Sequence, residues 1–128
     1  MPTYDASRFE PPAPIATVSV RNPISRETIG EVTMLIDTGA DVTFIPQAAV
    51  VALKLESSTK RDYRVTTYDG VSSLAKAVEA DMLFLGVTLR GLYLVRNTEV
   101  GIVGRDVLNR FCIVLNGPEL SWQEQPGS

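Results

Sequence analysis

The sequence predicts an all-β fold with one or two short helices. Short runs in which apolar and polar side chains alternate recur along the chain, as expected for strands that bury one face. Turn-forming residues such as Asn22-Pro23, Asp69-Gly70 and Asn116-Gly117 separate these runs. With 128 residues, of which 45% are apolar and 21% are charged, the chain fits one globular domain with a real core.

The chain begins with an arm and a hairpin. Residues 1–14 hold four prolines among charged and small residues, which favours an extended arm outside the core. Ile15 to Arg21 alternates and predicts a strand, and Thr28 to Ile36 is its expected partner. This hairpin leads directly to Asp37.

A short helix and a second hairpin follow. Val42 to Ile45 is a β-rich run, and the proline after it suits the first position of a helix over Gln47 to Leu55. Arg61 to Tyr68 and Val71 to Leu85 flank Asp69-Gly70, which is a strong hairpin signal. The alanines of the second run also tolerate a helix, so both alternatives stay open there.

The last part of the chain alternates strands with tight turns. In order we expect a strand over Leu89 to Arg96, a loop over 97–101, a short strand ending at Gly104, a helix from Arg105, a terminal hairpin of 111–115 with 119–122, and a frayed tail over 123–128. The body of the domain is therefore predicted over residues 15–122.

Composition excludes several function classes. A net charge of −3 with scattered Lys and Arg provides no basic stripe, which argues against nucleic acid or an anionic membrane surface as a partner. The chain has no histidine, so neither a Ser-His-Asp or Cys-His arrangement nor a zinc site with histidine ligands can be assembled. Carboxylates must supply any acid and base chemistry, and we expect no metal and no cofactor.

The single cysteine and the lengths of the apolar runs carry two further predictions. Cys112 lies within the apolar run Phe111 to Leu115, which predicts a buried structural thiol, and one cysteine cannot form an internal disulfide. No segment reaches the roughly 20 apolar residues of a membrane span, and the N-terminus lacks the pattern of a secretory signal. We expect a soluble cytoplasmic protein.

Asp37-Thr38-Gly39 is the first candidate site. The apolar run Val32 to Ile36 reads as a buried strand that delivers Asp37 at its end. The Thr38 hydroxyl can hydrogen-bond and Gly39 permits a backbone path closed to other residues, which suits a tight loop that holds one carboxylate in place. The alternative is an ordinary turn, because Asp, Thr and Gly are common turn residues.

A second suggestive segment runs from Gly101 to Phe111. Two β-branched residues and Gly104 predict a short strand that passes close against another backbone, because glycine has no side chain to keep the two apart. The spacing of Val107, Leu108 and Phe111 fits one or two turns of helix packed on the core.

Together these motifs resemble the retropepsin family, the single-domain aspartic proteases of retroviruses and their cellular relatives. The resemblance rests on Asp-Thr-Gly-Ala-Asp at 37–41, a glycine-bearing hairpin, and Ile-Val-Gly-Arg-Asp-Val-Leu at 102–108, in that order. It covers 15–122 and implies the closed, β-barrel-like acid protease fold. The proline-rich start and the Gly-Pro turn near the end look more like bacterial members than viral ones.

The resemblance also implies a mechanism and a partner. Aspartic proteolysis needs two adjacent carboxylates, one ionised and one protonated, because like charges about 3 Å apart cannot both ionise. The chain carries one Asp-Thr-Gly, so a second copy must supply the other catalytic Asp37 in a homodimer. By the same resemblance, Thr38 would link the two loops, and Glu119 to Trp122 could join a dimer sheet.

Charged residues beside the loop form a second constellation. In retropepsins the residues that match Asp41 and Arg105 form an ion pair next to the active site, and the aspartate also contacts the substrate backbone. The alternative for either residue is a solvated surface charge. Asp106 could cap or solvate the short helix.

The second hairpin is the candidate flap. Tyr68-Asp69-Gly70-Val71 would form its tip, close over an extended peptide and exclude bulk water, with Gly70 supplying freedom to move. A rigid surface hairpin is the alternative, and Tyr68 could pack instead of lining the pocket. Four apolar residues are first of all core and secondarily walls of substrate subsites: Val42, Phe44, Leu83 and Val103.

Ala40 indicates the working pH. Pepsin-like loops commonly carry Ser or Thr here, whose hydroxyl can donate to the carboxylate and favour its ionised form, whereas alanine cannot. We therefore expect activity nearer mildly acidic or neutral pH than strongly acidic pH.

The sequence thus predicts a homodimeric aspartic endopeptidase that hydrolyses extended peptide segments. A retropepsin-shaped module that binds peptides or dimerises without cutting is the alternative from another class. The intact Asp37-Thr38-Gly39 favours the enzyme, because a retired site need not keep its carboxylate. A protease restricted to one partner or to its own N-terminal arm is a further option.

Overall fold

A computed structural model describes residues 2–56, 63–66 and 70–125. The predicted all-β fold with one or two short helices is confirmed. No helix in these residues is long and apolar enough to cross a membrane. In chain order the elements are β1 (Tyr4–Asp5), β2 (Ala13–Arg21), β3 (Thr28–Ile36), β4 (Phe44–Pro46), α1 (Gln47–Ala52), β5 (Tyr63–Thr66), β6 (Ser72–Ala75), β7 (Ala77–Phe84), β8 (Val87–Arg96), β9 (Gly101–Val103), α2 (Arg105–Leu108), β10 (Ile113–Asn116) and β11 (Ser121–Glu124).

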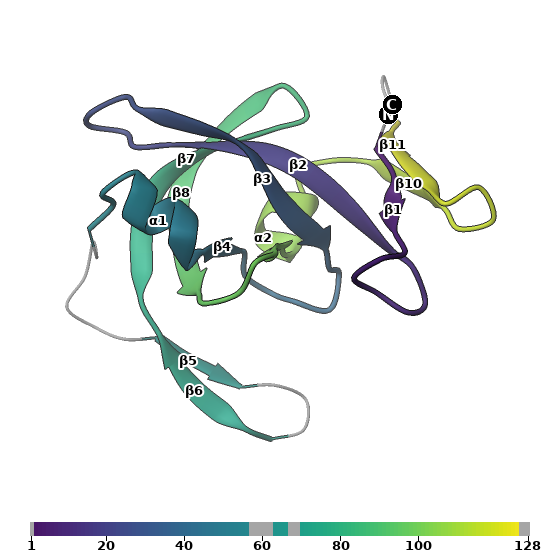
Figure 1. Cartoon of the computed structure of the whole chain (residues 1–128), viewed down its shortest axis with the longest axis horizontal. Helices are drawn as coiled ribbons and strands as arrows, with labels where there is room; N and C mark the ends of the chain where they lie inside the picture. Colours follow the sequence, from purple (N-terminus) through teal and green to yellow (C-terminus); the bar gives the residue numbers. More distant parts are fainter. Residues whose placement is uncertain (1, 57–62, 67–69, 126–128) are drawn as a thin grey trace.

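Six of the described strands close into a barrel. They follow the order β2-β3-β9-β4-β8-β7, and β7 pairs with β2 again to complete the circle (Figure 1). The pairs β3–β9 and β4–β8 are parallel and the other pairs are antiparallel. Closure removes the open edges that a sheet would otherwise expose, and it confirms the predicted barrel.

Alternation in the strands fills the barrel with apolar side chains. In β2, Ala16, Val18 and Val20 point inward and are 5%, 2% and 0% exposed, as the sequence pattern predicts. The same alternation in β3 buries Met34 and Ile36. Because Asp37 follows directly on this strand, the core fixes where its backbone lies.

A buried carboxylate reinforces the closure of the barrel. Asp81, at the middle of β7, pairs in register with Arg21 of β2 and Arg90 of β8. Its carboxylate accepts hydrogen bonds from Arg90 Nε at 2.8 Å and from Arg21 Nε at 3.0 Å, while its side chain is only 1% exposed. The Arg90 and Arg21 guanidinium groups hold the pKa of Asp81 below its ordinary value. This carboxylate thus joins the three strands where the barrel closes.

The helix α1 is shorter than predicted. It ends at Ala52 instead of Leu55, because Leu53 leaves helical geometry and Lys54 adopts a positive φ of 53°. Ala49 and Val50 face the core, which accounts for the apolar spacing in the sequence.

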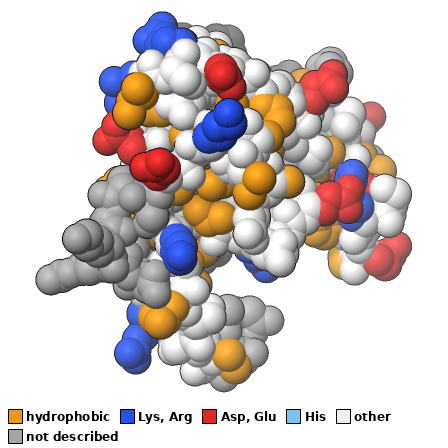
Figure 2. All heavy atoms as spheres, turned by 60° about the vertical axis from the view of Figure 1, so that its left-hand side comes forward, with side chains coloured by type: hydrophobic (Ala, Val, Ile, Leu, Met, Phe, Trp, Pro, Cys, Tyr) orange, Lys and Arg blue, Asp and Glu red, His pale blue; other side chains and the backbone are white. Residues whose placement is uncertain are grey.

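The hairpin of β5 and β6 projects from the barrel. Figure 1 shows it below the body, and Figure 2 shows the same part as a separate lobe with hydrophobic side chains on its surface. Leu74 is 66% exposed there. The run predicted over 71–85 is strand rather than helix and breaks at Lys76 into β6 and β7. Of the predicted flap tip, Tyr68 and Asp69 lie outside the described residues, and Gly70 has a φ of 88°.

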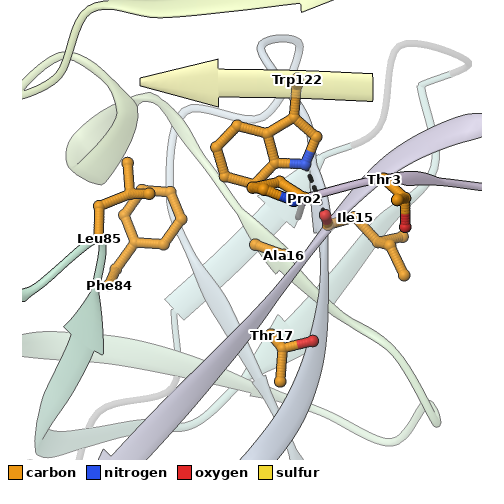
Figure 3. Close-up of a pocket in the computed structure, with 8 residues that line it drawn as sticks. All are labelled: Pro2, Thr3, Ile15, Ala16, Thr17, Phe84, Leu85 and Trp122. Atoms are coloured by element: carbon orange, nitrogen blue, oxygen red, sulfur yellow. Dashed lines mark hydrogen bonds between the residues drawn. The ribbon is translucent and has the colours of Figure 1, made fainter. Parts of the chain in front are cut away.

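The strands β1 and β11, near the two ends of the chain, lie at one end of the barrel. β1 pairs with β2, Thr3 forms a bridge with Ser121, and Trp122 Nε1 donates to the Ile15 carbonyl at 2.7 Å (Figure 3). The expected free arm is therefore tied to the barrel through Tyr4–Asp5, and β11 extends to Glu124, within the segment expected to fray. The domain boundaries themselves stay predictions.

The prediction for Cys112 is wrong, because its side chain is exposed. The apolar run forms the two-stranded ribbon β10–β11 instead of an interior strand. One side of this ribbon packs through the buried Trp122, while Val114 and Leu115 on β10 are 38% and 45% exposed. A local apolar run does not distinguish a strand covered on both faces from one covered on a single face.

Candidate active site

The Asp37 carboxylate is held by its own loop. Asp37 follows β3, and its backbone N–H donates to Val103 of the parallel neighbour β9 at 3.1 Å. Its Oδ1 accepts the Gly39 N–H at 2.9 Å, and its carbonyl accepts the Ala40 N–H at 3.2 Å. A Cβ on Gly39 would lie 3.1 Å from Oδ1, so glycine leaves room for this turn. The carboxylate is therefore oriented before any ligand binds.

Arg105 supports the loop, although not in the predicted way. Its Nη1 donates to the Thr38 carbonyl at 2.7 Å and its backbone N–H donates to the Ala40 carbonyl at 2.8 Å. Among the described residues, Arg105 forms no ion pair with Asp41, contrary to the prediction. The reason is that the guanidinium group turns to a backbone acceptor in the loop. Arg105 therefore positions the Asp37-Thr38-Gly39 turn from the side of α2.

Gly104 allows the two motifs to meet. A Cβ there would collide with the carbonyl oxygen of Val42, so only glycine fits between the two segments. The residue has a φ of −94°, which any residue can adopt, and the requirement is therefore steric. The predicted close approach of this glycine to another backbone is found.

Thr43 is a site residue that the sequence reasoning missed. Its side chain is fully buried, its hydroxyl donates to Asp106 Oδ1 at 2.6 Å, and the same hydroxyl accepts the Gly104 N–H at 3.0 Å. Asp106 also accepts the Thr43 N–H at 3.2 Å and its own neighbour's N–H, from Val107, at 2.9 Å. The available signal was a polar residue inside the apolar run Val42 to Ile45.

A cleft of about 880 Å³ lies between the loop and the β5–β6 hairpin. Its walls come from the Asp37 loop, β4, the hairpin, the end of β8, β9 and the start of α2, and they consist of Asp37, Gly39, Ala40, Asp41, Phe44, Val65, Thr66, Ser73, Leu74, Ala75, Val95, Arg96, Asn97, Ile102 and Arg105. An extended chain laid along the loop would be covered by the hairpin from one side.

The predicted site residues divide between the cleft and its surroundings. Phe44 lines the cleft, whereas Val42, Leu83 and Val103 do not, and Val103 is fully buried core. Thr38, Gly70 and Val71 also lie outside the lining. Ile102, Arg96 and the hairpin residues line the cleft but were not predicted, since nothing local in a sequence brings the end of β8 beside residue 37.

A second, smaller hollow of about 300 Å³ carries no ionisable side chain in its lining (Figure 3). It lies between the N-terminal arm, β2, the end of β7 and β11, and is lined by Pro2, Thr3, Ile15, Ala16, Thr17, Phe84, Leu85 and Trp122. Among the described residues, no group of three or more Cys, Asp and Glu side chains could hold a metal ion. Of these two hollows, the cleft at Asp37 is the one whose lining carries carboxylates and guanidinium groups.

The closed barrel, with an Asp-Thr-Gly loop at the end of β3, defines a retropepsin-like aspartic protease fold. Residues 28–110 match the family model for the gag-polyprotein putative aspartyl protease, and the chain belongs to this family. Among solved structures, it is similar to EIAV protease complexed with the inhibitor HBY-793, with a TM-score of 0.56 and 23% identity over 77% of this chain and 86% of that chain. No curated protein sequence matches it.

Proposed function

We propose that the chain is an aspartic endopeptidase that works as a homodimer. The observation that carries the proposal is the Asp37 carboxylate, fixed by the Gly39 N–H at 2.9 Å and lining a cleft large enough for an extended peptide. The family and the EIAV protease, which binds an inhibitor, support the same chemistry.

The second carboxylate comes from a second copy. The sequence holds one Asp-Thr-Gly, at residues 37–39. Around a two-fold axis, two Asp37 side chains would share one proton, because they cannot both ionise at contact distance. Each chain thus contributes one catalytic carboxylate, and the catalytic pair forms only when two chains associate.

Hydrolysis then proceeds without a covalent intermediate. The ionised carboxylate removes a proton from water, whose oxygen attacks the peptide carbonyl carbon, while the protonated carboxyl donates a hydrogen bond to the carbonyl oxygen. The resulting tetrahedral species collapses when the C–N bond breaks and the amine leaves with a proton from the dyad. The hairpin keeps bulk water, other than the attacking molecule, out of the cleft during these steps.

The test is hydrolysis of unfolded casein by the purified chain and by Asp37→Asn. We expect the wild-type chain to cut casein. The rate of hydrolysis by the variant should be at least about a thousand-fold lower, because the substitution removes a group that acts in both proton transfers. Glu31→Gln is the control, because Glu31 is an exposed carboxylate on β3 outside the cleft. Equal peptide binding without cleavage by either protein would favour the non-catalytic module instead.

A further inference from the structure

We propose that Arg96 makes the cleft selective for peptides that carry an acidic side chain. This inference rests on the proposed function and names its substrate class. Arg96 is the last residue of β8, is exposed, and lines the same cleft as Asp37. Asn97, which follows it, lines the cleft as well and adds an amide donor.

The Arg96 guanidinium is placed by packing and not by a carboxylate. Its Cζ lies 6.0 Å from the centre of the Phe44 ring, within reach of a cation–π contact. Phe44 is only 9% exposed and packs in a small cluster of buried side chains with Leu94 and Ile102, so the position of its ring is fixed by packing. The cation is therefore held against the cleft wall.

Four other arginines of the described chain have acceptors for their side chains. Arg21 and Arg90 pair with Asp81, Arg8 pairs with Asp5 and Glu99, and Arg105 gives Nη1 to the Thr38 carbonyl. No such acceptor is found for Arg96 among the residues that the structure describes. Its planar set of N–H donors thus faces the cleft with capacity for a ligand carboxylate, which a guanidinium group can bind through two parallel hydrogen bonds.

Dimer symmetry sharpens the expectation. A two-fold axis through the Asp37 pair would place one Arg96 on each side of the scissile bond. Acidic side chains should therefore be favoured at two positions of the substrate, one before and one after the bond that is cut. Asp41 and Arg105 beside the loop carry opposite charges, so they add little net preference of either sign.

The first measurement is a cleavage profile on a library of peptides, read by mass spectrometry, which identifies the enriched positions. Peptides with Glu, Gln or Lys at one such position are then compared. We expect kcat/KM to be roughly ten-fold higher for the Glu peptide than for the Gln peptide, because a charge-assisted hydrogen bond contributes a difference of about this size. In Arg96→Gln the ratio should fall to about one, and in Arg96→Glu the Lys peptide should become the best of the three.

Arg26→Glu is the matched control. Arg26 lies on the exposed β2–β3 turn, is outside the cleft lining and makes no ion pair with a described residue, and its reversal changes the net charge equally. It should keep the preference for Glu. The same Glu:Gln ratio in Arg96→Glu as in the wild type, or no acidic preference in the wild type, would overturn the assignment.

A binding measurement distinguishes failure of the proposed protease function from failure of the proposed acidic subsite. Fluorescence anisotropy of dye-labelled Glu and Gln peptides with Asp37→Asn, with and without Arg96→Glu, measures selectivity without hydrolysis. If no protein cuts any peptide, tighter binding of the Glu peptide that disappears with Arg96→Glu still supports the acidic subsite. Equal binding of both peptides overturns it.

Discussion

Thr43 donates its hydroxyl to Asp106 across 2.6 Å, and this contact links the segment after the Asp37 loop to α2. The same hydroxyl accepts the N–H of Gly104, so one buried oxygen serves both partners. Thr43→Val keeps the shape and removes the oxygen, which leaves a buried N–H without an acceptor. We expect a loss of about 1–3 kcal/mol in the free energy of unfolding, measured by urea titration with Trp122 fluorescence.

Thr88→Val is the control for that variant, because Thr88 is an exposed threonine on β8. It should shift the urea midpoint far less at the same protein concentration. An equal shift in both variants would mean that the Thr43 contact contributes little to the fold.

Gly104→Ala tests the close approach of the two motifs. A Cβ at this position would collide with the Val42 carbonyl, so the backbone must move, and we expect a cost of about 1–3 kcal/mol or more. Gly117→Ala is the matched control, since a Cβ there meets nothing within 4 Å. Urea midpoints of the two variants should differ clearly, and similar midpoints would show that the barrel adjusts without strain.

Asp81 gives the stability a pH dependence of defined sign. Its pKa is lowered in the folded state by Arg90 and then by Arg21. A carboxyl of this kind stabilises the fold above its unfolded pKa of about 3.9, and this stabilisation is lost as the pH falls through the lower folded pKa. We expect Asp81→Asn to lower the free energy of unfolding by about 1–3 kcal/mol at neutral pH, because the buried carboxylate is lost while the partly exposed Arg21 and Arg90 can turn to water.

The measurement is Tm against pH for the wild type and for Asp81→Asn. The variant should start lower and fall less steeply below about pH 4. Some fall should persist, because Ser7 and Arg8 also lower the pKa of Asp5. Glu79→Gln, an exposed carboxylate on the same strand, serves as control. Parallel curves for the wild type and Asp81→Asn would contradict the role given to this ion pair.

Ala40 leads to a prediction about the pH optimum. It is part of the loop, where its N–H donates to the Asp37 carbonyl, and its methyl group has no donor for a carboxylate. Wild-type kcat/KM should peak at mildly acidic to neutral pH, and Ala40→Ser should move the peak toward acid, since a hydroxyl favours the ionised form. Ala48→Ser on the exposed side of α1 should not move it. A wild-type optimum near pH 2 would contradict this prediction.

Local patterns predicted the strands well and their environment less well. Alternation located β2 and β3 because each buries one face, and the glycine of the second motif indicated a tight contact. The exposure of Cys112 was not predicted, because it depends on which face of the ribbon the rest of the chain covers. The end of α1 at Ala52 was not predicted either, because it depends on where the backbone leaves helical geometry. Non-local pairing decides such cases.

The candidate site was predictable as a loop but not as a cleft. Asp37, Gly39 and Ala40 could be identified from the four neighbouring residues 37–40 and the apolar strand before them. Arg96 and Thr43 could not, because they reach the loop only through the barrel pairings β4–β8 and β4–β9. Arg105 was identified, but its acceptor was not. The Thr38 carbonyl and the Asp41 carboxylate are both near in sequence, and the sequence does not show which of them accepts from the guanidinium group.

The central claim is that Asp37 works only with the Asp37 of a second copy. Mixing wild-type protein with increasing amounts of Asp37→Asn at fixed wild-type concentration, while peptide hydrolysis and sedimentation are recorded, tests it most directly. If mixed dimers are inactive, activity must fall as the variant captures wild-type chains, and dilution of the wild type alone must lower the activity per chain. Undiminished hydrolysis by a sedimenting monomer, at every mixing ratio, would contradict the account.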